Sequence, residues 1–187
     1  MSAADRCESP AVEGRWRVAI LTVSDLGSRG EREDQSGDYL ARRIADLPAV
    51  VELRGLLPDE PGEVEGWLRA TVKELRPALV LCTGGTGLHP RDRTPEAVLA
   101  LADYVVPGMA EAMRREGAAH TPHAMLSRQV AVVLGPTLIL ALPGALKAAQ
   151  ESLEAVWPAL PHALEMVAGL PSASTDLGHR GGAGAPH

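Results

Sequence analysis

The sequence predicts an α/β fold with three layers, doubly wound, whose mostly parallel sheet carries an antiparallel hairpin near the C-terminus. Short apolar runs of strand length alternate with amphipathic helical segments. That alternation is typical of βαβ crossovers and of a parallel sheet covered on both faces. Two late apolar runs are joined only by Gly135-Pro136, a link too short for a crossover, so we expect them to pair antiparallel.

The first half of the domain is expected to hold strands at 18–23, 50–57 and 78–83 and helices at 36–47 and 62–75. The strands are continuous or partly alternating apolar runs, each followed by turn-forming or polar residues. The first helix shows apolar residues at helical spacing and stops at Pro48. Residues 26–35, between the first strand and this helix, are predicted to form a polar loop.

The second half is expected to hold helices at 95–102, 107–119 and 145–167 and hairpin strands at 129–134 and 137–142. Proline opens the second of these helices, at a position where its missing N–H costs nothing. Pro158 and Pro161 lie inside the last helix and predict a kink or break near Trp157.

Length and composition favour one domain over residues 15–169, with a disordered leader over 1–14 and a disordered tail over 170–187. The net charge of −6 argues against a nucleic-acid partner. The chain holds two cysteines, too few for a disulfide framework, and shows no apolar run of membrane-spanning length and no signal peptide. We therefore expect a cytoplasmic protein without a membrane partner.

A glycine-rich segment, Gly84-Gly85-Thr86-Gly87, follows a predicted buried strand and precedes Asp92. Glycines allow positive φ and let backbone N–H groups approach an anion. Thr94-Pro95 then has the composition of a helix start, with threonine as N-cap, and a helix N-terminus attracts anions. The segment is neither a Walker A motif nor GxGxxG, and tight turns need glycine in any case, so the motif alone leaves a plain turn open.

Acids follow three of the predicted strands: Asp25, Asp59 and Asp92. Ligands of open α/β sheets bind beyond the carboxyl ends of the strands, where these acids are expected to meet. Carboxylates beside a phosphate repel it unless a divalent cation lies between them. The sequence therefore predicts Mg²⁺ and a phosphorylated substrate, with Asp59 and Asp92 as the metal ligands. The pair His120 and His123 is a weaker metal candidate, because no cysteine lies nearby.

From about Arg15 to Gly169, the chain resembles the molybdopterin adenylyltransferase family, of MoaB/Mog type, in an ordered series of motifs. These are Ser24-Asp25 with Gly30, Asp34, Ser36 and Gly37; Pro58-Asp59-Glu60; Thr83-Gly84-Gly85-Thr86-Gly87; Pro90-Arg91-Asp92-Arg93-Thr94-Pro95-Glu96-Ala97; Pro107-Gly108 with Glu111; Thr121-Pro122-His123-Ala124-Met125-Leu126-Ser127-Arg128; and Leu142-Pro143-Gly144. Where the family commonly has a small polar residue and a proline before a lysine, this chain has Ala145-Leu146-Lys147. That departure puts a polar contact from position 145 in doubt.

The resemblance implies an enzyme of molybdenum cofactor biosynthesis that transfers AMP from Mg–ATP to the phosphate of molybdopterin and releases pyrophosphate. It implies Asp59 and Asp92 as catalytic residues and Mg²⁺ ligands. It also implies a homotrimer and a transient contact with a metal insertase of the same pathway. The residues implied to bind nucleotide or pterin are Ser24, Asp25, Gly84, Gly85, Thr86, Gly87, Ser127, Arg128, Pro143 and Gly144.

The alternative is a non-catalytic molybdopterin-binding module of the same fold. Such a module has no need of both acids. The presence of Asp59 together with Asp92 therefore favours the enzyme.

Overall fold

The structure, a computed structural model, describes residues 11, 12 and 14–169. Most of the expected leader and the whole expected tail, 170–187, lie outside the described residues. Ala11 and Val12 form the short strand β1, which pairs antiparallel with Arg15 and Trp16. Gly14, between them, adopts a φ of 75°, which allows the tight reversal. Residues 11 and 12, which the sequence analysis assigned to a disordered leader, thus form a strand at the edge of the sheet.

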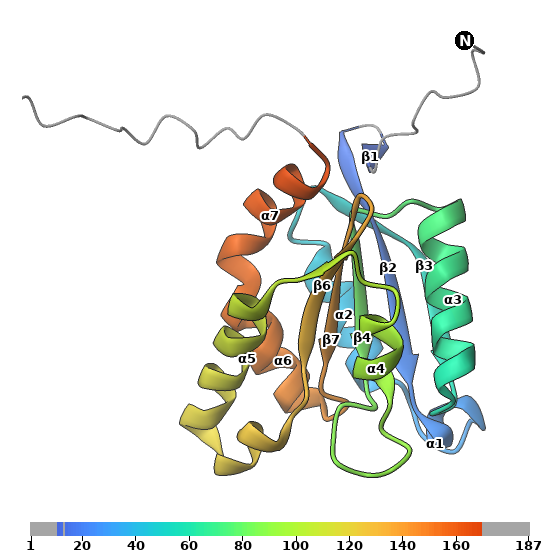
Figure 1. Cartoon of the computed structure of the whole chain (residues 1–187), viewed down its shortest axis with the longest axis vertical. Coiled ribbons are helices and arrows are strands. Elements are labelled where there is room, and N and C mark those ends of the chain that lie inside the picture. Colours follow the sequence, from blue (N-terminus) through green and yellow to red (C-terminus); the bar gives the residue numbers. More distant parts are fainter. Residues whose placement is uncertain (1–10, 13, 170–187) are drawn as a thin grey trace, which may run out of the picture.

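The described part of the chain forms one sheet of seven strands, flanked by helices (Figure 1). The order runs β1-β2-β4-β7-β6-β5, with β3 on β2. Strands β3, β2, β4 and β7 are mutually parallel, whereas β6 pairs antiparallel with β7 and β5 antiparallel with β6. This confirms the mostly parallel sheet and the C-terminal hairpin. The longer strands are β2 (Arg15–Val23), β3 (Ala49–Leu57), β4 (Leu79–Thr83), β6 (Val130–Leu134) and β7 (Thr137–Leu142), and β5 is Tyr104–Val105.

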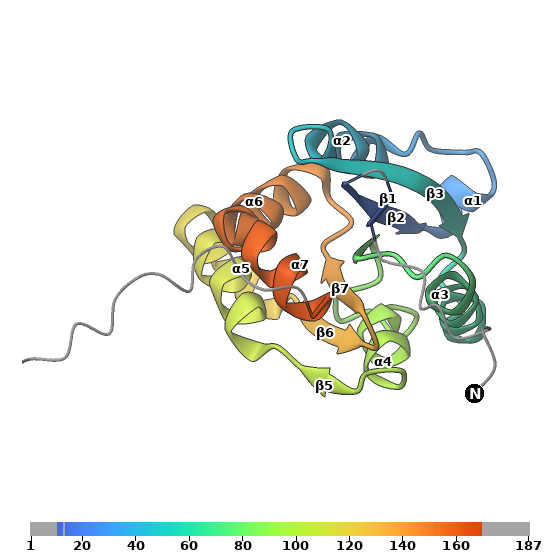
Figure 2. The ribbon, with the colours of Figure 1, turned by 90° about the horizontal axis from the view of Figure 1, so that it is seen from above.

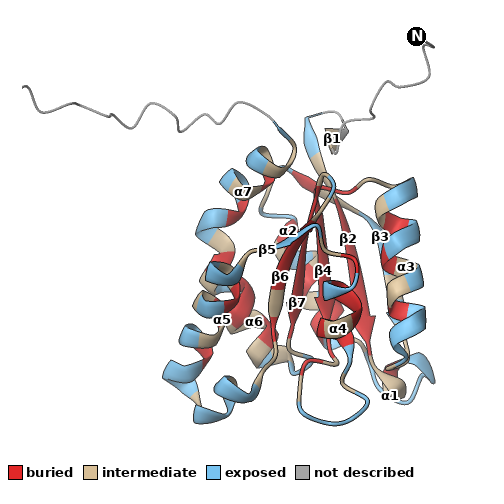
Figure 3. Ribbon diagram, in the orientation of Figure 1, coloured by how far each residue is buried: buried red, intermediate tan, exposed pale blue. Residues whose placement is uncertain are grey.

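The helices cover both faces of the sheet and so make the three predicted layers (Figure 2). Helices α2, α5, α6 and α7 pack on one face, and α3 and α4 on the other. The central strands β4 and β7 are wholly buried and β2 is buried from Val18 onward, whereas the edge strands β3 and β5 are partly exposed (Figure 3). The helices are α1 (Asp25–Ser28), α2 (Gln35–Ile44), α3 (Pro61–Glu74), α4 (Thr94–Leu99), α5 (Pro107–His120), α6 (Leu146–Val156) and α7 (Leu160–Val167), with short 3₁₀ turns at Pro122–Leu126 and Trp157–Ala159.

Each central strand alternates between the two layers. In β2, Val18 and Ile20 belong to the cluster beneath α2, α5, α6 and α7, whereas Ala19 and Leu21 belong to the cluster beneath α3 and α4. Residues of opposite parity point to opposite faces of a strand, so a sheet covered on both sides reads as an uninterrupted apolar run. Cys82 is part of this core, fully buried and unpaired, as its place in a predicted strand suggested.

Three local features differ from the sequence-based expectation. The segment 26–35 is not all loop, because Ser24 accepts a hydrogen bond from the Gly27 N–H and starts the short helix α1. Thr94 is the first residue of α4 and not its N-cap, and no side-chain bond caps this helix. Strand β5 was not foreseen, because two residues carry no periodicity. The break near Trp157 is confirmed.

The strand order reverses between β2 and β4. From β2 the chain crosses to β3 on one side, and from β4 it continues toward β5, β6 and β7 on the other. At such a point the loops that leave neighbouring strands diverge and open a crevice beyond the carboxyl ends of the strands. The segments following Val23 and Thr83 border this crevice.

No helix in the described residues is long and apolar enough to span a membrane.

Candidate functional site

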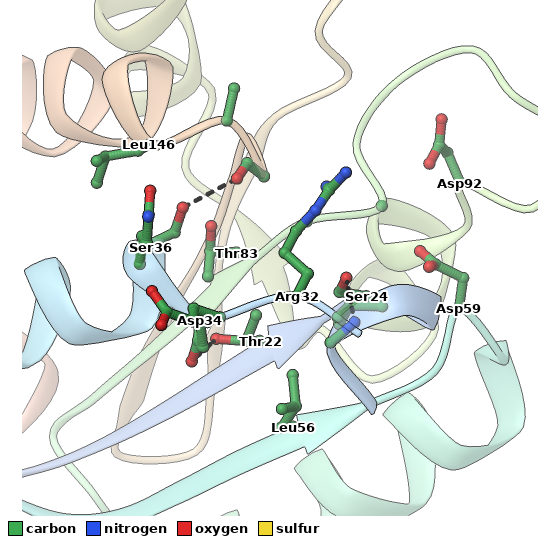
Figure 4. A pocket seen from close by; sticks show the side chains of 18 residues that line it. Thr22, Ser24, Arg32, Asp34, Ser36, Leu56, Asp59, Thr83, Asp92 and Leu146 are labelled. Carbon is green, nitrogen blue, oxygen red and sulfur yellow. Dashed lines mark hydrogen bonds between the residues drawn. The ribbon is translucent and has the colours of Figure 1, made fainter. Parts of the chain in front are cut away.

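A cleft with two lobes lies at this carboxyl edge of the sheet. The first lobe, about 670 Å³, lies over the ends of β2 and β4 (Figure 4). The second, about 480 Å³, extends toward the C-terminal end of α5 and the start of α6. The lobes share a boundary that we call the junction, lined by Arg32, Gly85, Asp92, Gly144 and Ala145. Two adjoining chambers allow two ligands to meet at the junction.

The glycine turn between β4 and α4 forms part of both lobes. Gly84 and Gly85 have φ values of 104° and 62°, in the left-handed region. A Cβ on Gly84 would collide with the carbonyl oxygen of Val23, and one on Gly85 with the Thr94 hydroxyl. Gly87 does not adopt positive φ. The turn therefore approaches β2 and α4 more closely than any side chain permits.

The N–H groups of this turn fall into two classes. Gly84 donates to the Leu142 carbonyl at 3.1 Å, which holds the turn against β7. The N–H groups of Gly85, Thr86 and Gly87 donate no hydrogen bond to any described protein atom. Unpaired backbone donors beside a cleft are suited to bind an anion.

Asp59 and Asp92 both line the first lobe, as Figure 4 shows. The Asp59 carboxylate accepts the Asp25 N–H at 3.0 Å, and the Asp92 carboxylate accepts the His89 N–H at 3.0 Å. Burial, and secondarily the negative charges of Asp25 and Asp92, raise the pKa of Asp59 above its ordinary value. The two acids thus occupy one cavity in which their charges repel.

Asp25, the third acid, has a different role. Its N–H and carboxylate exchange hydrogen bonds with Asp59, at 3.0 and 3.1 Å, which ties the end of β2 to the end of β3. Arg91 donates to both of its carboxylate oxygens, at 3.0 and 2.9 Å, and holds the pKa of Asp25 below its ordinary value. Arg91 also pairs with Glu60 at 3.0 Å. Asp25 lines neither lobe. Its contacts hold Asp59 and Arg91 in position at the edge of the cleft.

Arg128 also lines neither lobe, although the family resemblance implies that it binds nucleotide or pterin. Its Nε donates to the Gly87 carbonyl at 2.8 Å, and its two Nη groups donate to the Asp92 carbonyl and to Glu96. One guanidinium thereby spans the loop between the glycine turn and α4. Arg128 thus holds the backbone of Asp92 in place from outside the two lobes.

Replacing Arg128 by lysine is expected to loosen this loop, because one ammonium cannot reach three separate acceptors. The lost bonds leave polar groups unpaired, at a cost of about 1–3 kcal/mol. Amide hydrogen exchange over residues 87–94 should become faster, while exchange in the strands stays unchanged. Arg93→Lys is the matched control, because Arg93 contacts the same Glu96 from an exposed position, at 3.6 Å. Equal exchange in both variants would refute the bracing role.

The other predicted residues line the cleft. The first lobe includes Ser24 and Gly84, and the second includes Ser127, whose hydroxyl lies 3.4 Å from that of Thr86. Ten of the twelve residues predicted for the site therefore line one lobe or both: Ser24, Asp59, Gly84, Gly85, Thr86, Gly87, Asp92, Ser127, Pro143 and Gly144.

Several cleft residues were not assigned a role from the sequence. Ser36 donates to the Gly144 carbonyl at 2.9 Å and Thr83 to the Pro143 carbonyl at 2.7 Å, so both hold the turn after β7. Asp34 caps α2 through the Gly37 N–H and accepts the Thr22 hydroxyl. Asp34 and Ser36 belong to a quoted motif, which was the available signal. Arg32 carried no signal.

Within the described residues, no group of three or more histidine, cysteine or carboxylate side chains is arranged to hold a metal ion. His120 lies near Glu116 and Glu151, at 3.3 and 3.9 Å, in pairs that do not extend to His123. The structure therefore gives no support to a metal site at this pair of histidines.

Residues 19–162 match the family model described as "Probable molybdopterin binding domain". The chain belongs to this family. It is 39% identical over 170 residues to the molybdopterin adenylyltransferase of Haemophilus influenzae, a match covering 82% of this chain and 85% of that protein. It is 54% identical to the structure of the molybdopterin biosynthesis enzyme MoaB from Thermus thermophilus, with a TM-score of 0.77, over 84% of this chain and 99% of that one. Both of these similar proteins are named for molybdopterin chemistry.

Some relatives are much longer. The match to gephyrin of Dictyostelium discoideum, 37% identical, covers 92% of this chain and 25% of that protein. The match to a molybdenum cofactor biosynthesis bifunctional protein of Synechococcus elongatus, also 37% identical, covers 81% of this chain and 47% of that protein. The chain thus spans a quarter to about half of the length of these two relatives.

Proposed function

We propose that this protein is a molybdopterin adenylyltransferase, which transfers AMP from ATP to the phosphate of molybdopterin and releases pyrophosphate. The observation that carries the proposal is the two-lobed cleft with Asp92 at its junction and Asp59 beside it. A transfer between two bound substrates needs two adjoining chambers and charge control where they meet. The names of the relatives support the same reaction.

Asp59 and Asp92 are the residues that would hold Mg²⁺. Mg²⁺ is commonly bound by one or two carboxylates together with substrate phosphates and water, so two acids suffice. The pKa of Asp59 is raised by burial and by the neighbouring negative charges, and a bound cation relieves both effects. The donor set therefore fits the ion, which would neutralise charge on the phosphates of ATP.

The second lobe suits the pterin. Gln129 and Glu151 line it, and the buried Oε1 atom of each accepts no hydrogen bond in the described part of the chain. Lys147 and His120 lie 3.7 and 3.9 Å from Glu151 Oε1, as ion-pair contacts beyond hydrogen-bond distance. A pterin ring presents two adjacent donors, its N3–H and 2-amino group, whereas the corresponding edge of adenine presents one donor and one acceptor. Buried acceptors are stabilised by donors. We therefore place pterin in the second lobe and Mg–ATP in the first.

The chain itself does little proton chemistry in this scheme. The attacking phosphate oxygen of molybdopterin is already ionised near neutral pH, so no strong general base is needed. The unpaired N–H groups can bind phosphate oxygens, that of Gly85 at the junction and those of Thr86 and Gly87 in the adjoining second lobe. The chain's contribution is to align the substrates and to stabilise charge.

The test is incubation of the purified protein with molybdopterin, ATP and Mg²⁺, followed by detection of adenylylated pterin and pyrophosphate. We expect both products in equal amounts, and neither when Mg²⁺ is withheld. Binding of molybdopterin without AMP transfer would instead support a non-catalytic binding module.

The homotrimer, the contact with a metal insertase and the cytoplasmic location rest on the family resemblance, and they stay predictions. Light scattering of the purified protein tests the first of them. A mass of three chains is expected, and a monomer would contradict it.

A further inference from the structure

Arg32 differs from the other residues of the cleft in its charge. It is the single arginine or lysine among the described residues that line either lobe, and it lines both. The other charged residues of the lining are acids, apart from the ionisable His123; the acids are Glu33, Asp34, Asp59, Asp92 and Glu151. A cleft that receives phosphates needs positive charge, and here one side chain supplies it.

The neighbouring arginines are engaged with acids. Arg54 pairs with Asp34 and Asp38, Arg91 with Asp25 and Glu60, and Arg128 with Glu96. By contrast, no ion pair or hydrogen bond joins the Arg32 side chain to the described part of the chain, although acids line the same lobe. Figure 4 shows this side chain extending into the cleft, between Ser36 on one side and Asp59 and Asp92 on the other. Its guanidinium is free to meet a ligand.

The backbone that carries Arg32 is anchored on both sides. Before it, the N–H groups of Gly30 and Glu31 donate to carbonyls of α1, each at 2.9 Å. After it, the Asp34 carboxylate accepts the Gly37 N–H and the Thr22 hydroxyl, each at 2.8 Å. Only Arg32 and Glu33 lie between these anchors. The backbone at Arg32 is therefore already ordered before a ligand binds. Less backbone entropy is lost when the guanidinium contacts the ligand.

We propose that Arg32 is a catalytic residue that contacts the phosphate transferred across the junction. The proposal rests on the proposed function. In the reaction, a phosphate oxygen of molybdopterin forms a bond to the α-phosphorus of ATP. The bond from that phosphorus to the oxygen bridging to the β-phosphorus breaks, and pyrophosphate leaves with the electron pair. Because Arg32 reaches both lobes, it stabilises the equatorial oxygens of the α-phosphorus when their charge is greatest.

The kinetic test compares Arg32→Ala and Arg32→Lys with Arg29→Ala. Arg29 lies three residues away, pairs with Glu31 and lines neither lobe, so it is the matched control. We expect Arg32→Ala to lower the single-turnover rate of AMP transfer about 100- to 1,000-fold, with a much smaller change in the KM for ATP. Arg32→Lys should recover part of the rate, because it keeps the charge but not the planar fork. A rate for Arg32→Ala equal to that of Arg29→Ala, or a change confined to KM, would overturn the proposal.

A binding test does not depend on turnover. AMP carries the transferred phosphate, and adenosine lacks it, so both are titrated into the wild type and the two alanine variants. We expect Arg32→Ala to weaken AMP binding about tenfold and to leave adenosine binding unchanged. Suppose that the wild type transfers no AMP, but Arg32→Ala still weakens the binding of AMP and not that of adenosine. That result would refute the proposed function and leave the contact between Arg32 and phosphate standing. Equal AMP affinity in the wild type and Arg32→Ala would refute the contact with phosphate.

Discussion

Replacement of Asp92 by asparagine is expected to lower the rate of AMP transfer about a hundredfold or more, roughly 3 kcal/mol of transition-state stabilisation, while the fold stays intact. Asparagine can still accept the His89 N–H, which holds the side chain at 3.0 Å. It loses the negative charge that would bind Mg²⁺ at the junction. Circular dichroism and thermal unfolding check the fold, and the single-turnover rate checks the chemistry.

Asp46→Asn provides the control for Asp92→Asn. Asp46 is an exposed acid that pairs with Arg43 and does not line the cleft. Its replacement should leave both rate and stability nearly unchanged. A fully active Asp92→Asn protein would refute the assignment of Asp92 as a metal ligand. A rate of AMP transfer that depends less on Mg²⁺ concentration in Asp92→Asn than in the wild type would support the assignment.

Replacement of Asp59 by asparagine is expected to raise the stability of the fold at neutral pH and to lower the rate of AMP transfer. The pKa of Asp59 is raised in the folded protein, mainly by burial, so the folded state holds this proton more tightly than the unfolded state. The resulting contribution to stability is present below the ordinary carboxyl pKa and is lost as the pH rises through the folded-state pKa. At neutral pH the ionised carboxylate therefore destabilises the fold, and asparagine removes that cost.

The expected result is a higher melting temperature for Asp59→Asn than for the wild type at pH 7.5, a difference that shrinks toward pH 4. AMP transfer should fall about a hundredfold or more, because a ligand of Mg²⁺ is lost. Melting curves at both pH values, with and without Mg–ATP, check the account. Mg–ATP should stabilise the wild type more than the variant. A variant less stable at pH 7.5 than at pH 4, relative to the wild type, would contradict the assigned environment of Asp59.

The sequence was sufficient for the fold because its signals are local. Buried apolar runs marked the five longer strands, and the short link Gly135-Pro136 marked the hairpin. Parallel strands place their carboxyl ends along one edge, so the residues that follow them were expected to meet. Asp59, Asp92 and the turn at Gly84 do meet there. This part of the candidate site follows from topology alone.

What the sequence left open depends on partners distant in the chain. Asp25 and Asp59 each follow a strand and look alike in the sequence. In the structure, however, Arg91 donates two hydrogen bonds to the Asp25 carboxylate, whereas Asp59 lines the cleft. Arg128 resembles a phosphate ligand until its contacts with Gly87 and Asp92 are known. Arg32 lies in a segment read as an undifferentiated polar loop. The structure is needed to see that its guanidinium is free, because only there do the nearby arginines, Arg54, Arg91 and Arg128, form ion pairs with acids.

The most direct test of the central claim follows the phosphorus atoms of ATP. The protein is incubated with molybdopterin, Mg²⁺ and ATP labelled either at the α-phosphorus or at the γ-phosphorus, and the products are separated. The account predicts that the α label appears on the pterin and the γ label in pyrophosphate, in equal amounts. A γ label on the pterin, or labelled ADP and inorganic phosphate with an unmodified pterin, would contradict it.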